Sequence, residues 1–302
     1  MSHAADAAWM DALVATLRAT PGIVDAAKPS PAWRRIGGNG AASVWSVALG
    51  PSRFFAKVAD GQDAEMLAAE ADGLHAIGET ASVRVPQVIA IGHAASAAFL
   101  VLEWLDIASG GRDGALGRAL ARLHAHTAPR FGWHRDNTIG PTPQHNAWLD
   151  DWATFFRERR LAPQFALASR NGYGGALQRH GERLLGRVDA LLDGHQPRAS
   201  LLHGDMWAGN ASRLADGTPV VFDPSTYYGD READLAMTEL FGGFAPDFYA
   251  AYAEESPLPD GRAQRRTLYN LYHVLNHLNL FGEGYLARAE AMTAELAAAA
   301  GA

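Results

Sequence analysis

The sequence of 302 residues contains no cysteine, which excludes disulfide bonds, thiolate metal sites and cysteine nucleophiles. Long hydrophobic runs are missing as well. None approaches the roughly 18 apolar residues that a membrane span needs, so we expect no membrane partner. The first residues lack the basic flank and apolar core of a secretion signal, and Trp9, Leu13 and Leu17 recur at helical spacing instead. We therefore expect an amphipathic amino-terminal helix and a cytoplasmic protein.

Positive charge is scarce, and lysine is scarcer still. Asp and Glu number 33 against 26 Lys and Arg, a net charge of −7 that disfavours nucleic acid as a partner. Only Lys28 and Lys57 are lysines, so the other 24 of the 26 basic residues are arginine. Lys57 lies in the apolar run Phe54 to Val58, which a solvated charge would avoid. This context favours a functional need for lysine over the alternative, a surface residue on an edge strand.

Apolar residues make up 48% of the chain, enough for a large core in two domains or one two-lobed domain. Short apolar runs separated by glycine predict strands at 33–60, 85–91 and 98–102, with helices at 1–20 and 63–78. After Glu103 the pattern becomes mainly helical, over 114–127, 147–161, 176–193 and from 248 onward, with strand candidates near 201–202 and 220–222. We therefore predict an α+β fold with a small β-rich, nucleotide-binding N-lobe (1–103). The predicted C-lobe (104–302) is larger and mainly helical, and carries the catalytic loop and the acceptor site.

The strongest local motif is HGDMWAGN, from His203 to Asn210, followed thirteen residues later by Asp223 after an apolar run. Phosphoryl transfer needs a carboxylate to accept the acceptor proton, and oxygen ligands that hold Mg²⁺ against the phosphates. The H-x-D-x-x-x-x-N spacing predicts Asp205 as the base, and Asn210 and Asp223 as magnesium ligands. A turn-capping Asp and a left-handed Asn are the structural alternative. The later strand-end Asp favours the kinase interpretation.

The amino-terminal third would then bind ATP. The glycine-rich segment IGGNGAAS can close a strand–turn–strand backbone over phosphates, although most such turns are plain hairpins. From it we predict contacts from Gly38, Asn39, Gly40 and Ser43. Lys57, one strand later, could reach the phosphates, with Glu70 as its partner and Glu65 and Asp72 as competitors. Glu103 and Leu105 lie where the chain crosses between lobes and where adenine would meet the backbone.

Two further segments allow a functional and a structural interpretation. Residues 130–152 combine three tryptophans with hydrogen-bonding side chains, which suits either a sugar-like ligand or a large anchored loop. From the first interpretation we predict acceptor contacts from Trp133, Asp136 and Asn137, and from Trp207 in the HGD loop. Asp234 starts a helix, where it can act as a cap or brace a neighbouring loop.

Paired histidines occur twice, and neither pair predicts a metal site. His273 and His277 have the i, i+4 spacing of zinc ligands, but the Glu of H-E-x-x-H and a third ligand are missing. We expect them to be satisfied polar residues of a packed helix, and the same holds for His124 and His126.

Together the segments HGDMWAGN, FDPSTYYGDREADLAMTELFGGF, FGWHRDNTIG and LYHVLNHLNLFGEGY resemble the fructosamine kinase (ketosamine-3-kinase) family. This family is a branch of the aminoglycoside-phosphotransferase and protein-kinase-like superfamily. The resemblance spans about residues 10 to 290. It implies ATP-dependent phosphorylation of a fructosamine or ribulosamine, usually at O3, on a small-molecule ketoamine or on a glycated protein lysine. A phosphate at O3 is placed for elimination driven by the C2 carbonyl, which would release the amine and initiate deglycation.

The resemblance also implies that His203 supports the HGD loop and that Asp234 braces it. Some family members carry a cysteine in the glycine-rich loop that permits disulfide-linked dimers. This chain has none, so that redox control is excluded and the oligomeric state is left open. The alternatives are a related kinase for an aminoglycoside or choline-like compound, and a nucleotide-binding pseudokinase. The presence of Lys57, Asp205, Asn210 and Asp223 disfavours the pseudokinase.

Overall fold

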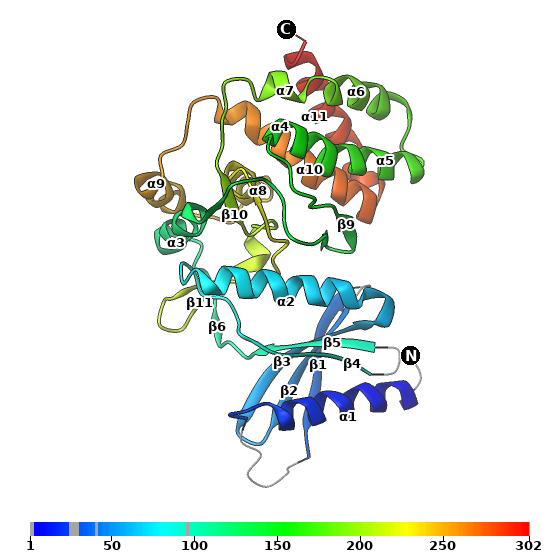
Figure 1. Ribbon diagram of the computed structural model, residues 1–302, viewed down its shortest axis with the longest axis vertical. Coiled ribbons are helices and arrows are strands. Elements are labelled where there is room, and N and C mark those ends of the chain that lie inside the picture. The colour runs from blue at the N-terminus through cyan, green and yellow to red at the C-terminus, as the bar shows by residue number, and fades with distance from the viewer. Residues whose placement is uncertain (1–2, 24–29, 40–41, 95–96, 302) are drawn as a thin grey trace.

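The computed structural model describes residues 3–23, 30–39, 42–94 and 97–301, which form two lobes (Figure 1). The N-lobe holds a five-stranded antiparallel sheet in the order β1-β2-β3-β5-β4. Its elements are α1 (His3–Ala19), β1 (Ala32–Asn39), β2 (Ala42–Leu49), β3 (Ser52–Asp60), η1 (Gly61–Asp63), α2 (Ala64–Glu79), β4 (Val88–Ala94) and β5 (Ala97–Glu103). In Figure 1, α1 lies on one side of this sheet and α2 lies between the sheet and the C-lobe.

The two helices explain why β5 is apolar along its length rather than alternating. Phe99 and Val101 pack into the cluster that contains Trp9, Leu13 and Leu17 of α1. Their neighbours Leu100 and Leu102 belong to the main core, together with the buried face of α2. Successive side chains of a strand point to opposite faces, so a sheet covered on both faces needs an unbroken apolar run. The amphipathic helix expected at the start of the chain is confirmed.

The C-lobe is mainly helical and is built around α10. Its helices are α3 (Gly114–Ala125), α4 (Trp152–Phe156), the π-helical η2 (Arg157–Leu161), α5 (Ala162–Arg170), α6 (Gly175–Leu185), α7 (Val188–Leu191), η3 (Ala208–Asn210), α8 (Glu232–Leu240), α9 (Pro246–Glu255), α10 (Arg262–Phe281), η4 (Glu283–Tyr285) and α11 (Leu286–Ala299). Helix α10 packs against α5, α8 and α11. Helices α3 and α9 touch so closely that a Cβ on Gly117 would lie 2.1 Å from the Phe248 carbonyl oxygen. The predicted two-lobed α+β fold is confirmed.

Short paired strands connect the loops of the C-lobe to one another. They are β6 (Ile107–Ala108), β7 (Thr127–Ala128), β8 (Asn137–Ile139), β9 (Thr142–Gln144), β10 (Ala199–Leu202), β11 (Ala211–Leu214), β12 (Pro219–Val221) and β13 (Tyr227–Gly229). The sheets run β13-β10-β7 and β12-β11-β6, and β8 pairs with β9. Strand β6, directly after the segment that leaves the N-lobe, pairs with β11 and so ties that segment to the strand that follows the HGD loop.

The helix predicted over 147–161 begins later than expected. Leu149 exchanges two backbone hydrogen bonds of 2.9 Å with Phe131, which keeps this segment extended. Asp151 then accepts from the Thr154 amide at 2.7 Å and caps α4. The helix predicted over 176–193 is divided into α6 and α7. Among the described residues, no helix is long and apolar enough to cross a membrane.

Candidate active site

The HGD loop, which begins at His203, follows β10 and is held by hydrogen bonds to the start of α8. Asp234 is buried and accepts from the backbone amides of His203 (2.7 Å) and Gly204 (2.9 Å), and from His124 Nε2 at 3.1 Å. Burial alone would raise the pKa of Asp234, but the hydrogen bonds and the nearby histidines outweigh it and lower that pKa below its usual value. The structure thus makes Asp234 both a helix-start carboxylate and an anchor for the loop.

Two local features set the path of this loop. Gly204 has φ +84°, and a Cβ there would lie 2.0 Å from the Ser225 carbonyl oxygen, so no larger residue fits. His203 lies within 3.1 Å of the Phe222 carbonyl through Nε2, and its Nδ1 accepts from the Asp205 amide at 3.3 Å. This pairing requires a neutral ring protonated at Nε2, and burial accordingly lowers the pKa of His203. The buried imidazole therefore supports the loop on which Asp205 stands.

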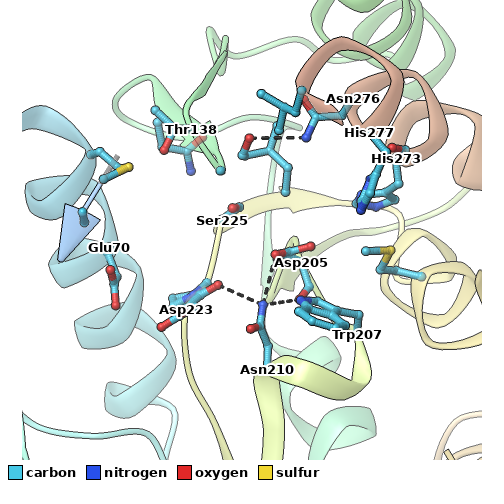
Figure 2. Close-up of a pocket in the computed structure, with 18 of the residues that line it drawn as sticks. Glu70, Thr138, Asp205, Trp207, Asn210, Asp223, Ser225, His273, Asn276 and His277 are labelled. Carbon is cyan, nitrogen blue, oxygen red and sulfur yellow. Dashed lines mark hydrogen bonds between the residues drawn. The ribbon is translucent and has the colours of Figure 1, made fainter. Parts of the chain in front are cut away.

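Asp205, Asn210 and Asp223 converge in one place (Figure 2). Asn210 Nδ2 donates to Asp205 Oδ2 and to the Asp205 carbonyl, both at 3.0 Å. Asp223 follows β12 with φ +58°, a left-handed conformation that is uncommon outside glycine, and its backbone carbonyl accepts from Asn210 Nδ2 at 3.5 Å. Burial and the charge of Asp223 raise the pKa of Asp205 to about 7. Hard oxygen donors suit a divalent cation.

Lys57 on β3 faces this cluster across the junction of the lobes. Its Nζ lies 2.8 Å from Glu70 Oε2 and 2.6 Å from Asp223 Oδ1. Burial would lower the pKa of Lys57, but the two carboxylates raise it above its usual value, so the amine is cationic. The structure brings Glu70 to Lys57, whereas Glu65 pairs with Arg135 and Asp72 accepts from Trp133.

Asp205, Asn210 and Asp223 line one cavity of about 650 Å³ together with Lys57. Gly38, Ala42 and Val44 line it from the N-lobe. Gly38 has φ +138°, and a Cβ there would lie 2.6 Å from the Ala42 carbonyl oxygen, so the tight hairpin requires glycine. Ser43 faces the opposite side of β2, where its hydroxyl bonds Trp45 Nε1 and the Val58 carbonyl. The Ser43 side chain therefore points away from this cavity, and the predicted ATP contact of Ser43 stays a prediction.

The predicted ATP contacts of Asn39 and Gly40, the other two residues of this loop, stay predictions. Asn39 ends β1, and Gly40 lies outside the described residues.

A second cavity, of about 570 Å³, lies beside the segment that joins the lobes. Ile36, Phe55 and Leu102 give it apolar walls, and both Glu103 and Leu105 line it. The Glu103 carboxylate accepts from Arg84 and from the Gln87 amide. An apolar cavity beside the segment that joins the lobes has the character that a purine base requires.

Helix α10 forms the wall opposite Lys57. In Figure 2, Asp205 lies between Asp223 and Glu70 on one side and His273 and His277 on the other. The lining from this wall consists of His273, Asn276, His277, Leu280, Phe281 and Tyr285, with Phe241 at the end of α8. His273 is buried, which lowers its pKa to about 3, so its ring is neutral and offers one donor and one acceptor.

A sequence model of the family described as fructosamine kinase matches residues 25–299. The chain belongs to the fructosamine kinase family. A Synechocystis protein named "Probable ketoamine kinase" is 48% identical over 249 residues, 80% of this chain and 82% of that protein. The rice (subspecies indica) protein named "Protein-ribulosamine 3-kinase, chloroplastic" is 41% identical over 244 residues, 80% of this chain and 70% of that one.

Solved structures agree with the family. A Haemophilus somnus protein described as a fructosamine-3-kinase superposes with a TM-score of 0.85 at 27% identity, covering 94% of this chain and 96% of that one. An aminoglycoside phosphotransferase bound to AMP-PNP and hygromycin B superposes with a TM-score of 0.62 at 14% identity, covering 90% and 94%. The second likeness shows the fold alone. As a member of the family, the chain is an ATP-using phosphotransferase whose acceptor is a hydroxyl group.

Within this family fold, the tryptophan-rich segment is largely an anchored loop. Trp133 is buried outside the cavity lining, where its Nε1 donates to Asp72 at 2.8 Å and its ring packs on Tyr228. Asp136 is exposed and bonds His145 and the Asn146 amide. Other partners occupy the polar atoms of Trp133 and Asp136 away from the cavity lining, so the structure gives no support to their predicted acceptor contacts.

Asn137 and Trp207 do line the cavity. The amide of Asn137 is already used, since it donates to the Thr226 carbonyl and accepts from Gln144 and Asn146. Trp207 is 39% exposed and lies over Gly209, where a Cβ would meet its ring at 2.2 Å. Of the two, Trp207 has the side chain that is available to a ligand.

The residues of the α10 wall were not among the predicted site residues. His277 Nδ1 donates to the His273 carbonyl at 2.8 Å, so the expectation of a satisfied polar pair holds for that atom. Both rings nevertheless line the cavity. The signal was present in the segment LYHVLNHLNLFGEGY, where two histidines and an asparagine recur on one helical face beside an aromatic-rich helix end.

Proposed function

We propose that the chain is a ketoamine kinase that transfers the γ-phosphoryl group of ATP to the O3 hydroxyl of a ribulosamine or fructosamine. One observation carries the proposal: Asp205 stands in a single cavity between a cationic Lys57 with its two carboxylates and a neutral polar wall from α10. A charged triphosphate suits the first side, and sugar hydroxyls suit the second. The acceptor is a small-molecule ketoamine or a glycated protein lysine.

In this proposal the base of ATP occupies the hinge cavity beside Glu103 and Leu105, and Lys57, oriented by Glu70, binds its phosphates. The Asn210 amide oxygen and the Asp223 carboxylate would hold Mg²⁺, and both are hard oxygen donors. Bound magnesium supplies charge neutralisation on the phosphates. Asp205 accepts the proton of the acceptor hydroxyl, whose oxygen bonds the γ-phosphorus as the bond to the β–γ bridging oxygen breaks and ADP leaves. Positioning and charge provide most of the rate enhancement.

The cavity argues against a polycationic aminoglycoside as acceptor. Among the described lining residues, the carboxylates are Glu70, Asp205 and Asp223, and the proposal already commits all three. A polycation would need further acidic groups on the acceptor side. The chain also has Lys57, Asp205, Asn210 and Asp223 in place, which favours turnover over nucleotide binding alone.

The test is ADP release from Mg-ATP with a ribulosamine, a fructosamine and an aminoglycoside offered in parallel. We expect turnover on a ketoamine, lost in Asp205→Asn, while nucleotide binding stays within about twofold of wild type. NMR of the product checks that phosphate sits on O3. Turnover on the aminoglycoside alone, or undiminished turnover in Asp205→Asn, would overturn the proposal.

A further inference from the structure

At the α10 end of the cavity three aromatic rings gather around the ring of His277. We call the set Phe241, His277, Phe281 and Tyr285 the aromatic collar. The His277 ring centroid lies 5.0 Å from that of Phe241, 5.3 Å from Phe281 and 5.1 Å from Tyr285. Phe281 is 67% exposed and Phe241 is 42% exposed, an unusual position for two large apolar side chains that line a cavity. Core packing does not explain rings that are left this open.

The polar chemistry of the collar is set by one hydrogen bond. Because His277 Nδ1 donates to the His273 carbonyl, a neutral ring has its proton on Nδ1 and presents Nε2 as an acceptor. Burial of His277, and the nearby Arg288 charge, lower the pKa of this ring and favour the neutral form. Nε2 is therefore a hydrogen-bond acceptor among aromatic faces, and aromatic faces also attract cations. None of the four collar residues carries a carboxylate.

A ketoamine has one feature that matches this chemistry. Its nitrogen is a secondary amine that is protonated near neutral pH, so it offers N–H donors and a positive charge next to an alkyl substituent. We propose that the aromatic collar is the subsite for this amine-bearing part: His277 Nε2 accepts from the ammonium, and Phe241 and Phe281 pack on the alkyl stem. This deepens the proposed function and rests on it.

The subsite determines which ketoamines are preferred. A longer apolar stem buries more surface against Phe241 and Phe281, so the enzyme selects N-alkyl ketoamines with an extended stem, as a lysine side chain provides. Since Phe281 stands largely in solvent, a stem that continues into a polypeptide can leave the cavity past it. The same geometry therefore admits protein-bound adducts.

The experiment compares two ketoamines with the same sugar and charge, ribulosyl-butylamine and ribulosyl-methylamine. For wild type we expect kcat/KM to favour the butyl compound about tenfold, the scale of a few methylenes in a partly open apolar site. Phe281→Ala should reduce that preference to about twofold or less. Ile91→Ala, which removes an exposed apolar side chain from β4 in the other lobe, should leave it unchanged.

A second variant separates the hydrogen bond from the apolar contact. His277→Phe keeps an aromatic ring and removes the acceptor, so kcat/KM should fall about tenfold for both compounds while their ratio stays the same. If wild type turns over both ketoamines and Phe281→Ala retains the full butyl preference, the collar is not the amine subsite and the proposed function stands. If wild type turns over neither, the proposed function fails, and this inference fails with it.

Discussion

The Asn210 amide nitrogen lies 3.0 Å from Asp205 Oδ2, so the residue proposed to hold the metal also orients the proposed base. An amide that donates through nitrogen keeps its oxygen for a cation. In the proposed function, proton acceptance and metal binding are thus joined through the Asn210 side chain.

Asn210→Ala removes both functions at once. We expect the magnesium concentration for half-maximal activity to rise about tenfold or more, because a hard oxygen ligand is lost. The value of kcat should fall as well, since the Asp205 carboxylate loses its donor. A magnesium titration of ADP release measures both effects, with Asn171→Ala as an exposed control. An unchanged magnesium requirement would show that Asn210 only orients Asp205.

Glu70→Gln tests the ion pair that orients Lys57. Hydrogen bonds to charged groups contribute about 1.5–3 kcal/mol, so kcat/KM for ATP should fall roughly ten- to hundredfold. Glu65→Gln is the matched control on the same helix, because the Glu65 side chain is 87% exposed and pairs with Arg135. Its activity should stay within about twofold of wild type. Equal losses in the two variants would mean that the effect comes from helix α2 and not from Lys57.

His273→Ala tests the α10 wall. The loss of one neutral hydrogen bond should raise KM for the ketoamine about three- to tenfold and leave KM for ATP unchanged. His273→Asn should restore part of the affinity. Because the pKa of His273 is about 3, this residue stays neutral from pH 5.5 to 8, and wild type and variant should share the same pH profile. A pH-dependent step that disappears in the variant would contradict a neutral role.

Asp234→Asn tests the brace under the HGD loop. Breaking this buried, charge-assisted network should cost about 3 kcal/mol of unfolding free energy at pH 7. The native pKa of Asp234 is lowered, so its contribution is complete above the unfolded-state pKa, near 4. It is lost as the pH falls through the native pKa. The difference between wild type and variant, measured by urea unfolding, should therefore shrink below pH 4.

The control for this variant is Asp150→Asn, whose side chain is 82% exposed in an ion pair with Arg130. It should change stability by less than about 0.5 kcal/mol over the same pH range. A difference for Asp234→Asn that grows as the solution becomes acidic would reverse the assigned direction of its pKa shift.

The fold and the HGD loop could be predicted from sequence because their signals are local. The change from predicted strands to predicted helices near residue 103 marks the two lobes. Asp205 and Asn210 lie on one short loop, so their spacing can be recognised directly. Pairing Lys57 with Glu70 needed the three-dimensional register of β3 against α2, because three carboxylates of the same helix were available to the sequence argument.

The acceptor side could not be assigned because its signals depend on long-range contacts. Trp133 lies in a segment whose composition suits a ligand contact. Its Nε1, however, donates to Asp72, which is far away in the sequence. His273 and His277 look like core histidines, and only the approach of α10 to the HGD loop turns them into cavity lining. The type of a residue alone does not show whether its side chain will face the cavity or a tertiary contact elsewhere.

The five-residue π-helical stretch after α4 carries Arg160, which is fully buried. Its guanidinium donates to the His145 carbonyl and to Asn146 Oδ1, both at 2.7 Å, and stacks 4.0 Å above the Tyr227 ring. A cation this deep is tolerated only where carbonyls and aromatic faces replace its hydration. Arg160 thereby fastens the tryptophan-rich loop to the helical core from within. Residues 137–140 of that loop line the cavity, so this buried cation holds part of the cavity wall in place.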